Sequence, residues 1–200
     1  MNAEKVLVIH NTQLNEFIIL NNLPKTGFLL LSSLQPFIDF IEEEHKFIER
    51  YKVEEDSEYK QIIPYIVIRN DKDETLLMQR TSKQSENRLH NKFSIGVGGH
   101  INQSDINGNM SPIFNGLNRE LNEEITIGKY AGPTFKGLIN DNDNNVGKYH
   151  LAVVFEIKSL DGVVKIKESD KMKGEWAAKQ KLQSKYEFME TWSKIILDNE

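Results

Sequence analysis

The sequence predicts an α/β fold in which a mixed sheet is held between helices. Apolar runs rich in Ile, Val and Leu lie both before and after one acidic helical stretch. A second segment with helical spacing of apolar residues closes the chain. Strands that flank a helix, followed by a closing helix, are typical of a sheet covered by helices. No internal repeat or low-complexity tract suggests another architecture.

Composition and charge exclude several classes of protein. The 200 residues are 38% hydrophobic, and the net charge is −5 with both signs interspersed, which argues against binding to nucleic acids or anionic membranes. The chain has no Cys, so disulfides, thiolate nucleophiles and zinc–thiolate sites are excluded. There is no signal-like start, and the longest apolar run is too short to span a bilayer. We therefore expect a cytoplasmic protein.

Residues 1–58 form an N-terminal α/β extension with few chemical signals. Residues 5–9 predict a short strand, and residues 21–27 contain Pro and Gly that indicate a turn. Residues 34–51 carry apolar side chains at helical spacing and predict one amphipathic helix. This extension could form a homodimer interface or a lid over a substrate, and the sequence leaves both open.

A hairpin is predicted next, with strands at residues 60–69 and 75–80 around a polar turn at residues 70–73. Pro64 predicts either a strand start or an edge position, since proline cannot donate to a ladder.

The loop at residues 80–92 is rich in cations and polar side chains. It suits phosphate binding, although a solubilising surface loop would have the same composition. The predicted substrate-binding side chains from this loop are Arg80, Lys83 and Arg88.

Three further strands and a helix complete the pattern. Residues 133–141, 148–157 and 163–167 predict strands, and residues 181–197 predict one helix with an apolar face. These elements supply the second half of the predicted sheet and one covering layer.

The stretch between Gly96 and Gly128 carries the chemistry. Paired glycines and a polar loop precede a helix that begins at Ser111–Pro112, where Ser can cap and Pro can occupy the first turn. On a helical wheel three glutamates border the apolar stripe, so we expect them to be half-buried at the seam between helix and core. The residues concerned are Arg119, Glu120, Glu123 and Glu124, with the stripe formed by Ile113, Leu117, Leu121 and Ile125.

Three acids in one partly desolvated site repel each other, and a divalent cation offsets that repulsion. Oxygen ligands without any Cys favour a hard ion, Mg²⁺ or Mn²⁺. The alternative is that the same spacing forms an ordinary solvated helix face.

Gly116 lies inside the predicted helix, where glycine costs about 1 kcal/mol relative to Ala. We expect close packing against the glycine loop at this position. The alternative is that the glycine is tolerated at this position and has no packing role.

Gly98-Gly99, the loop and the run Arg119-Glu-Leu-Asn-Glu-Glu resemble the Nudix box. Two departures stand out: Asp105 replaces the first Glu of the pattern with a loop expanded by six residues, and Thr126 replaces a Gly after the helix. The resemblance covers about residues 59–200. The segments KQIIPY, SENRLH, GVGGHIN, NVGKYHL and ETWSK are similar to the Nudix branch described as predicted phosphoesterases, and residues 1–58 resemble that branch as well.

The resemblance implies an α/β/α sandwich with a mixed sheet, formed by a Nudix domain at residues 59–200. It implies a pyrophosphohydrolase that cleaves a nucleoside diphosphate linked to another group with a metal-activated water. Mg²⁺ or Mn²⁺ would be held by Glu120, Glu124 and the Gly98 carbonyl, with Glu123 holding a second ion or its waters. Arg119 would orient the glutamates, and the general base would be Glu168 or Glu175.

His150 is a further candidate for contacting the small-molecule nucleotide or other diphosphate substrate, with a structural histidine as the alternative. A catalytically decayed nucleotide-binding module remains the competing function. An isopentenyl diphosphate isomerase is nearly eliminated because its catalytic Cys has no counterpart in this chain.

Overall fold

The structure is a computed structural model that describes residues 3–81, 92–108, 110–144, 146–167, 169 and 172–200. The chain divides into two compact units. Unit 1 comprises residues 1–65, 98–118 and 135–154, and unit 2 comprises residues 66–97, 119–134 and 155–200. Unit 1 therefore combines the predicted extension with parts of the predicted Nudix domain, and a domain boundary at residue 58 stays a prediction.

Four long elements run through both units, and the remaining elements belong mainly to one. The shared elements are β4 (Tyr59–Arg69), α4 (Pro112–Glu124), β9 (Tyr130–Asn140) and β10 (His150–Ser159). Unit 1 holds β1 (Lys5–His10), α1 (Asn11–Leu20), β2 (Gly27–Leu29), α2 (Gln35–Glu44), β3 (Lys46–Glu49), α3 (Arg50–Val53), η2 (Gln103–Asp105) and η3 (Gly147–Tyr149). Unit 2 holds β5 (Thr75–Arg80), β6 (Phe93–Ser94), most of β7 (Gly96–Gly98), β8 (Ile125–Ile127), β11 (Val164–Ile166), β12 (Met172–Ala177), α5 (Lys179–Lys185), η4 (Tyr186–Phe188) and α6 (Thr191–Asp198).

The main sheet has the strand order β12-β5-β4-β10-β9-β2 and is mixed. Near the start of β4, Lys60 Nζ donates to the carbonyl of Gly147, which precedes β10, and at the end of β4, Arg69 Nε lies 3.1 Å from Glu156 in β10. The neighbours β4 and β10 therefore run in the same direction. The pairings of β12 with β5, β5 with β4 and β2 with β9 are antiparallel. The predicted α/β class with a mixed sheet is confirmed.

Pro64 lies inside β4, so the prediction of a strand start is wrong. One edge of β4 changes partner along its length: β1 pairs with residues 59–61, β7 follows, and β5 joins at Arg69. Proline is tolerated where a strand lacks one continuous partner on the side of its missing N–H.

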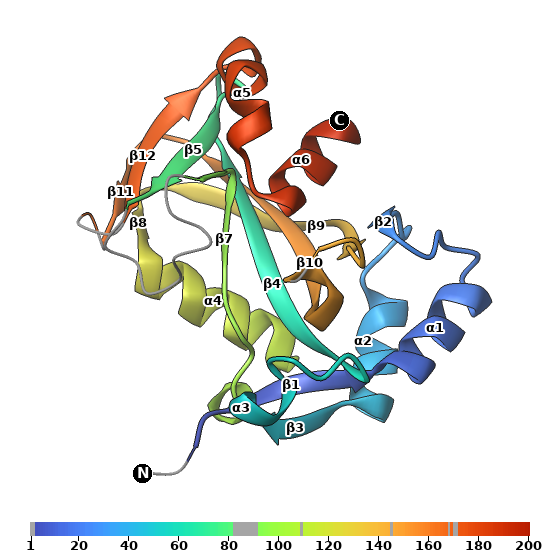
Figure 1. Cartoon of the computed structure of the whole chain (residues 1–200). Helices are drawn as coiled ribbons and strands as arrows, with labels where there is room; N and C mark the ends of the chain where they lie inside the picture. The colour runs from blue at the N-terminus through green and yellow to red at the C-terminus, as the bar shows by residue number, and fades with distance from the viewer. Residues whose placement is uncertain (1–2, 82–91, 109, 145, 168, 170–171) are drawn as a thin grey trace. The chain divides into compact units, whose positions relative to one another are not determined.

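The predicted helix over residues 34–51 is wrong in its second half. In unit 1, α2 ends at Glu44, His45 is extended, and β3 pairs antiparallel with β1, as Figure 1 also shows. Val8 faces Lys46 and Lys5 faces Glu49 across this ladder. The pairing overrides the helical spacing because it satisfies the backbone groups along one edge of β1. The predicted strand over residues 5–9 is confirmed by β1.

A helix that the sequence pattern did not predict, α1, packs against α2. The ring of Phe17 lies 5.6 Å from Phe37 and 4.7 Å from Phe40 between ring centroids. These aromatic contacts form part of the core of unit 1.

In unit 2 the predicted hairpin is confirmed by β4 and β5. The side chain of Asn70 organises its turn, because Asn70 Oδ1 accepts from the backbone N–H groups of Lys72 and Glu74. The unpredicted strand β12 pairs along the whole of β5, and the two lie side by side in Figure 1.

The closing helix predicted over residues 181–197 is interrupted. The chain forms α5, η4 and α6, and Met189 pairs with Phe93 of β6 in between. Glu190 also donates its backbone N–H to the carbonyl of Phe93 at 2.9 Å. A strand contact therefore replaces one helical turn. Among the residues that the structure describes, no helix is long and apolar enough to cross a bilayer.

Candidate functional site

The acidic helix α4 begins as predicted. Ser111 precedes Pro112, and Ser111 Oγ accepts from the backbone N–H of Ile113 at 3.4 Å. The Ser111 carbonyl accepts from Phe114 N at 3.0 Å. The predicted apolar stripe is buried, with Ile113 and Leu117 at 0% and Leu121 and Ile125 at 2% exposure.

The expected close approach at Gly116 is confirmed. A Cβ on Gly116 would lie 3.0 Å from Cγ1 of Ile101 and 3.3 Å from Oδ2 of Asp105. Ile101 lies two residues after Gly99 and is fully buried. The helix and the glycine loop therefore meet at a position where only a hydrogen fits without displacing a neighbour.

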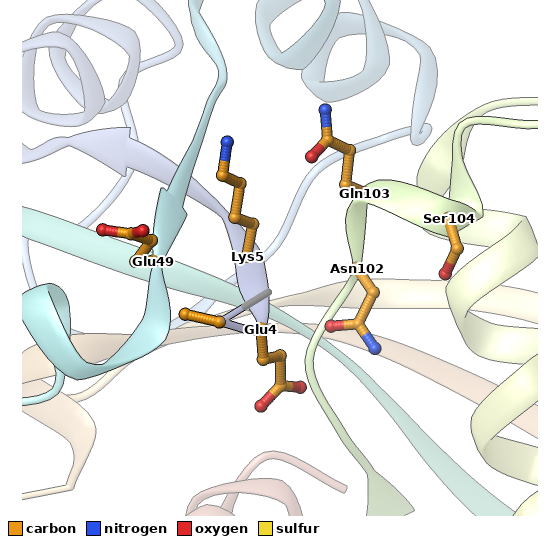
Figure 2. Close-up of a pocket in the computed structure, with 7 residues that line it drawn as sticks. Glu4, Lys5, Glu49, Asn102, Gln103 and Ser104 are labelled. Atoms are coloured by element: carbon orange, nitrogen blue, oxygen red, sulfur yellow. The ribbon is translucent and has the colours of Figure 1, made fainter. Parts of the chain in front are cut away.

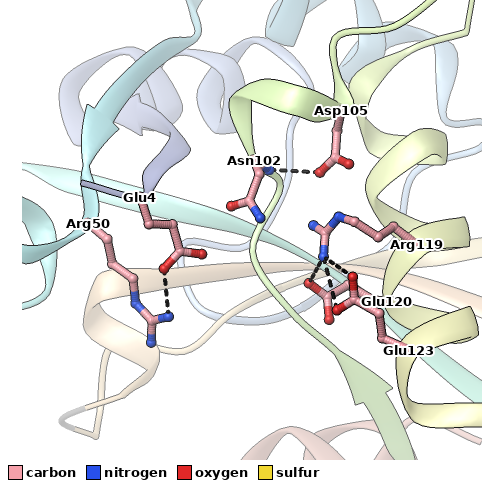
Figure 3. Close-up of polar contacts among 7 residues, drawn as sticks. All are labelled: Glu4, Arg50, Asn102, Asp105, Arg119, Glu120 and Glu123. Atoms are coloured by element: carbon pink, nitrogen blue, oxygen red, sulfur yellow. Dashed lines mark hydrogen bonds and ion pairs between the residues drawn. The ribbon is translucent and has the colours of Figure 1, made fainter. Parts of the chain in front are cut away.

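Asp105, which stands in place of the first Glu of the Nudix pattern, is 5% exposed in unit 1. Its Oδ2 accepts from the backbone N–H of Asn102 at 2.7 Å, closing the turn of η2 (Figure 3). The amide of Asn115 on α4 donates to the carbonyls of Asp105 and Asn107, both at 2.9 Å. These two hydrogen bonds therefore join the start of the expanded loop to the helix.

The three glutamates differ in environment. The side chain of Glu120 is 13% exposed, Glu124 is half-buried, and the side chain of Glu123 is 58% exposed. The expectation of three half-buried acids is thus wrong for Glu123. At about 100° per residue, Glu123 points roughly 140° from the centre of the apolar stripe, whereas Glu124 points only about 40° from it.

Arg119 joins two of the acids. Its Nη1 lies 2.7 Å from Oε1 of Glu120 and 3.4 Å from the carboxylate of Glu123 (Figure 3). The guanidinium therefore compensates part of the carboxylate charge of this helix in unit 2.

The chain after α4 continues directly as a strand, whereas the Nudix pattern implies a turn at this point. The Glu124 carbonyl accepts from Lys167 N at 2.8 Å, and Ile125 begins β8, which pairs with β11. Thr126 faces Lys165 in this ladder. A glycine is not required after the helix because β11 satisfies the backbone groups there.

The carboxylates suit a hard divalent ion in their chemistry. Glu120 and Glu124 are four residues apart on one helix and offer only oxygen donors from partly desolvated positions. In the described part of the chain, no group of three or more His, Asp and Glu side chains is gathered around one point. Mg²⁺ is commonly bound through one or two carboxylates together with water and substrate phosphates, so two glutamates fit this ion.

Of the other predicted side chains, Arg80 and Glu175 lie in unit 2, His150 lies in unit 1, and the rest lie outside the described residues. Lys83, Arg88 and Glu168 fall outside them. Arg80 Nε lies 2.7 Å from Oε1 of Glu190. Glu175 forms an ion pair with Lys181.

Glu175 also lines a hollow of about 260 Å³ in unit 2, on the face shared by β5, β6 and β12. Leu77, Gln79, Phe93 and Lys173 are among its other lining residues. A carboxylate beside a hollow is placed where it could contact a ligand.

His150 and His100 are neighbours in unit 1, with ring centroids 5.5 Å apart. His150 Nδ1 lies 2.7 Å from the carbonyl of Val146, so the backbone holds its ring orientation.

A buried lysine that was not predicted as a functional residue supports the loop before His150. Lys60 is 1% exposed, and its Nζ donates to Asn142 Oδ1 at 2.8 Å and to the Gly147 carbonyl at 2.7 Å. Burial lowers the pKa of Lys60 to about 8, while the nearby Asp141 acts in the opposite direction. A lysine at the start of a largely apolar strand was the available signal.

A second hollow, of about 480 Å³, opens in unit 1 and was not predicted (Figure 2). Its lining consists of Ala3–Lys5, which lead into β1, Glu49 of β3 and Asn102–Ser104. The last of these segments begins four residues after Gly98.

Comparisons with known proteins agree with the fold and with the sequence pattern. No protein-family model matches the chain. Protein YmaB of Bacillus subtilis (strain 168) is 37% identical over 165 residues, which is 79% of each chain. The crystal structure of Tm1382, a candidate Nudix hydrolase, is similar with a TM-score of 0.82 and 29% identity, over 98% of this chain and 97% of that chain.

Proposed function

Since this chain belongs to the Nudix hydrolase superfamily and shares its family with Protein YmaB, we propose that it is a divalent-metal-dependent pyrophosphohydrolase. Its substrate is a nucleoside diphosphate linked to another group, in which it cleaves a phosphoanhydride bond. The observation that carries this proposal is the helix α4, which presents partly buried Glu120 and half-buried Glu124 four residues apart beside Arg119.

Each residue has a proposed role. Glu120, Glu124 and the Gly98 carbonyl hold Mg²⁺ or Mn²⁺, and the exposed Glu123 holds a second ion or its waters. When bound, the ion lowers the pKa of water and offsets charge on the phosphate oxygens. Arg119 fixes the carboxylate of Glu120 in orientation through the 2.7 Å contact.

Substrate contacts are proposed for two groups of side chains. Arg80, Lys83 and Arg88 bind phosphate oxygens, and His150 contacts the substrate from unit 1. Glu175 is the proposed general base among the described residues because it lines a hollow and its side chain is 52% exposed. Glu168 is the alternative base.

The competing function is a catalytically decayed module that binds nucleotides without turnover. The presence of all three glutamates and of Arg119 on one helix favours the enzyme. A decayed site has no chemical need for two partly buried acids on one helix.

The test is a Mg²⁺-dependent screen of nucleoside triphosphates, nucleotide sugars, dinucleoside polyphosphates and NADH, with identification of the bond that breaks. Turnover that needs the ion and disappears in Glu124→Gln supports the proposal. Glu43→Gln is the matched control, because Glu43 is an exposed helical glutamate of α2. Tight binding of a nucleotide without any turnover would support the decayed module instead.

A further inference from the structure

The loop between β9 and η3 in unit 1 contains hydrogen bonds among its own described residues. Asn144 Oδ1 accepts from the backbone N–H groups of Val146 and Gly147, both at 2.8 Å. A Cβ on Gly147 would lie 2.3 Å from the carbonyl oxygen of Asp141, so the two ends of the loop are in close contact. These contacts give the loop its shape, but they do not determine where it lies against the rest of unit 1.

Lys60 joins this loop to strand β4. Its ammonium group donates to Asn142 Oδ1 at 2.8 Å and to the Gly147 carbonyl at 2.7 Å, and only 1% of Lys60 is exposed. A buried ammonium group is tolerated where fixed acceptors replace its water, so both contacts constrain the loop as well as the lysine. The ammonium group therefore fixes the loop relative to β4.

The backbone carbonyl next to this contact holds His150. The carbonyl oxygen of Val146, the residue before Gly147, lies 2.7 Å from His150 Nδ1. Because a carbonyl can only accept, Nδ1 carries a proton, and in the neutral ring Nε2 is the acceptor. With Nδ1 engaged by the backbone, a substrate contact of His150 would use Nε2. Lys60 and His150 therefore bind two successive backbone carbonyls.

Strand β4 also contacts the glycine loop. A Cβ on Gly98 would lie 2.3 Å from the carbonyl oxygen of Pro64, so Gly98 packs directly on the backbone of β4. Lys60 and Pro64 are four residues apart, which is about 13 Å along a strand. The ring of His100, two residues after Gly98, lies 5.5 Å from that of His150 between centroids. One strand therefore contacts both Gly98 and the loop that holds His150.

We propose that Lys60 is a positioning residue that holds this loop against β4 and so sets the ring of His150, relative to Gly98, for contact with the substrate. The inference rests on the proposed function, in which Gly98 holds the metal and His150 contacts the substrate. At 1% exposure, Lys60 acts on the substrate only through His150. Without the ammonium group, the Gly147 carbonyl loses this donor, and the adjacent Val146 carbonyl is held less firmly beside Nδ1.

The first experiment observes His150 directly, without substrate or metal. Proton–nitrogen correlation spectra of the full chain with ¹⁵N-labelled histidine assign its tautomer at about pH 7.5, where Lys60, with a pKa of about 8, is still mostly charged. We expect the Nδ1–H tautomer in the wild type and a mixture with the Nε2–H tautomer in Lys60→Met, which lacks the donors. An unchanged tautomer in Lys60→Met would overturn the inference.

Val53→Ala is the matched control for a loss of stability. Val53 is buried with Val6 and Val8 in another part of unit 1, so its truncation should destabilise the fold and keep the wild-type tautomer of His150. The same tautomer mixture in Val53→Ala as in Lys60→Met would show that any loss of stability releases the ring, which would also overturn the inference.

Asn142→Ala is a milder variant that decides the question if Lys60→Met does not fold. Asn142 is exposed, and its truncation removes one of the two acceptors while the lysine stays in place. We expect the same change at His150 with a smaller Nε2–H population, because the contact with the Gly147 carbonyl remains. If Lys60→Met is unfolded, a wild-type tautomer in Asn142→Ala overturns the inference.

The second experiment tests whether Lys60 acts through His150 during turnover. For a compound that is turned over in the screen, Lys60→Met should raise KM about fivefold, equivalent to one lost hydrogen bond, and leave kcat unchanged. In a His150→Ala background, Lys60→Met should not change KM further, because the side chain that it positions is absent. Equal increases in both backgrounds would overturn the inference. Complete absence of turnover in the screen would instead refute the proposed hydrolase, while the spectra still show whether Lys60 positions the ring of His150.

Discussion

Arg119 and Glu120 form a partly buried ion pair at 2.7 Å on the helix that carries the proposed metal ligands. Only 25% of the Arg119 side chain and 13% of the Glu120 side chain are exposed. The same guanidinium reaches the exposed Glu123 at 3.4 Å. The acids of α4 therefore differ in how far the protein itself stabilises their charge.

This difference predicts a ranking of stability. In chelator, Glu120→Gln should lower the free energy of unfolding by about 1 kcal/mol, because Arg119 loses its partly buried partner. Glu123→Gln should change it by less than about 0.5 kcal/mol, since an exposed pair contributes little. Urea unfolding of both variants measures the two values. Equal losses would show that the ion pair with Glu120 does not stabilise the fold.

Glu124→Gln should affect rate far more than stability. With Mg²⁺, turnover should fall by roughly two or more orders of magnitude because a proposed ligand loses its charge. Without metal, removing one of several neighbouring negative charges should leave the free energy of unfolding unchanged or raise it by about 0.5–1.5 kcal/mol. Initial rates and urea unfolding test both parts, with Glu43→Gln as control. Near-normal activity of Glu124→Gln would refute its assignment as a ligand.

Metal binding should also appear as thermal stabilisation. An ion that binds only the folded chain raises the free energy of unfolding by about 1.4 kcal/mol when its concentration is ten times its Kd. We expect a higher Tm in millimolar Mg²⁺ or Mn²⁺, and a smaller increase for Glu120→Gln. Melting curves that do not respond to either ion would count against the site.

Gly116→Ala tests the approach of α4 to Ile101. Alanine gains about 1 kcal/mol in helix propensity, but its Cβ would lie 3.0 Å from a fully buried Ile101 side chain that has little room to move. We expect a net loss of about 1 kcal/mol, and a larger loss for Gly116→Val. If Gly116→Ala is more stable than the wild type, the loop that carries Ile101 can move enough to accommodate the added Cβ.

The lowered pKa of Lys60 predicts how the free energy of unfolding depends on pH. Its folded pKa of about 8 lies below its ordinary value of 10.5, so between these values the unfolded chain binds more protons than the folded chain. The contribution of Lys60 to the free energy of unfolding should therefore rise with pH through this window, by on the order of 3 kcal/mol in total. Urea unfolding of the wild type and Lys60→Met at pH 7.5, 8.5 and 9.5 isolates this residue. A difference that stays constant with pH would contradict the lowered pKa.

The strongly periodic elements were predictable from the sequence because their own residues determine them. The hairpin of β4 and β5, the start of α4 at Ser111 and its buried stripe follow from local spacing, capping and turn chemistry. The close contact at Gly116 was also predictable, since an internal helical glycine has a local cost that a close neighbour explains.

Elements that depend on a distant partner required the tertiary structure. Residues 46–49 have helical spacing, yet they form β3 because the edge of β1 offers backbone hydrogen bonds. The break between α5 and α6 similarly follows from the pairing of Met189 with Phe93. The local sequence pattern contains no information about a strand edge that a distant part of the chain supplies.

The same division holds for the candidate site. The sequence by itself determined which side chains carry the proposed chemistry, namely Arg119 and the glutamates of α4, because their identity and spacing lie within one helix. Only the tertiary structure decided that Glu120 is paired and partly buried while Glu123 is exposed, and that Lys5 and Asn102–Ser104 line one hollow. Burial and charge compensation depend on groups that folding brings together from distant positions, so they have no local signature in the sequence.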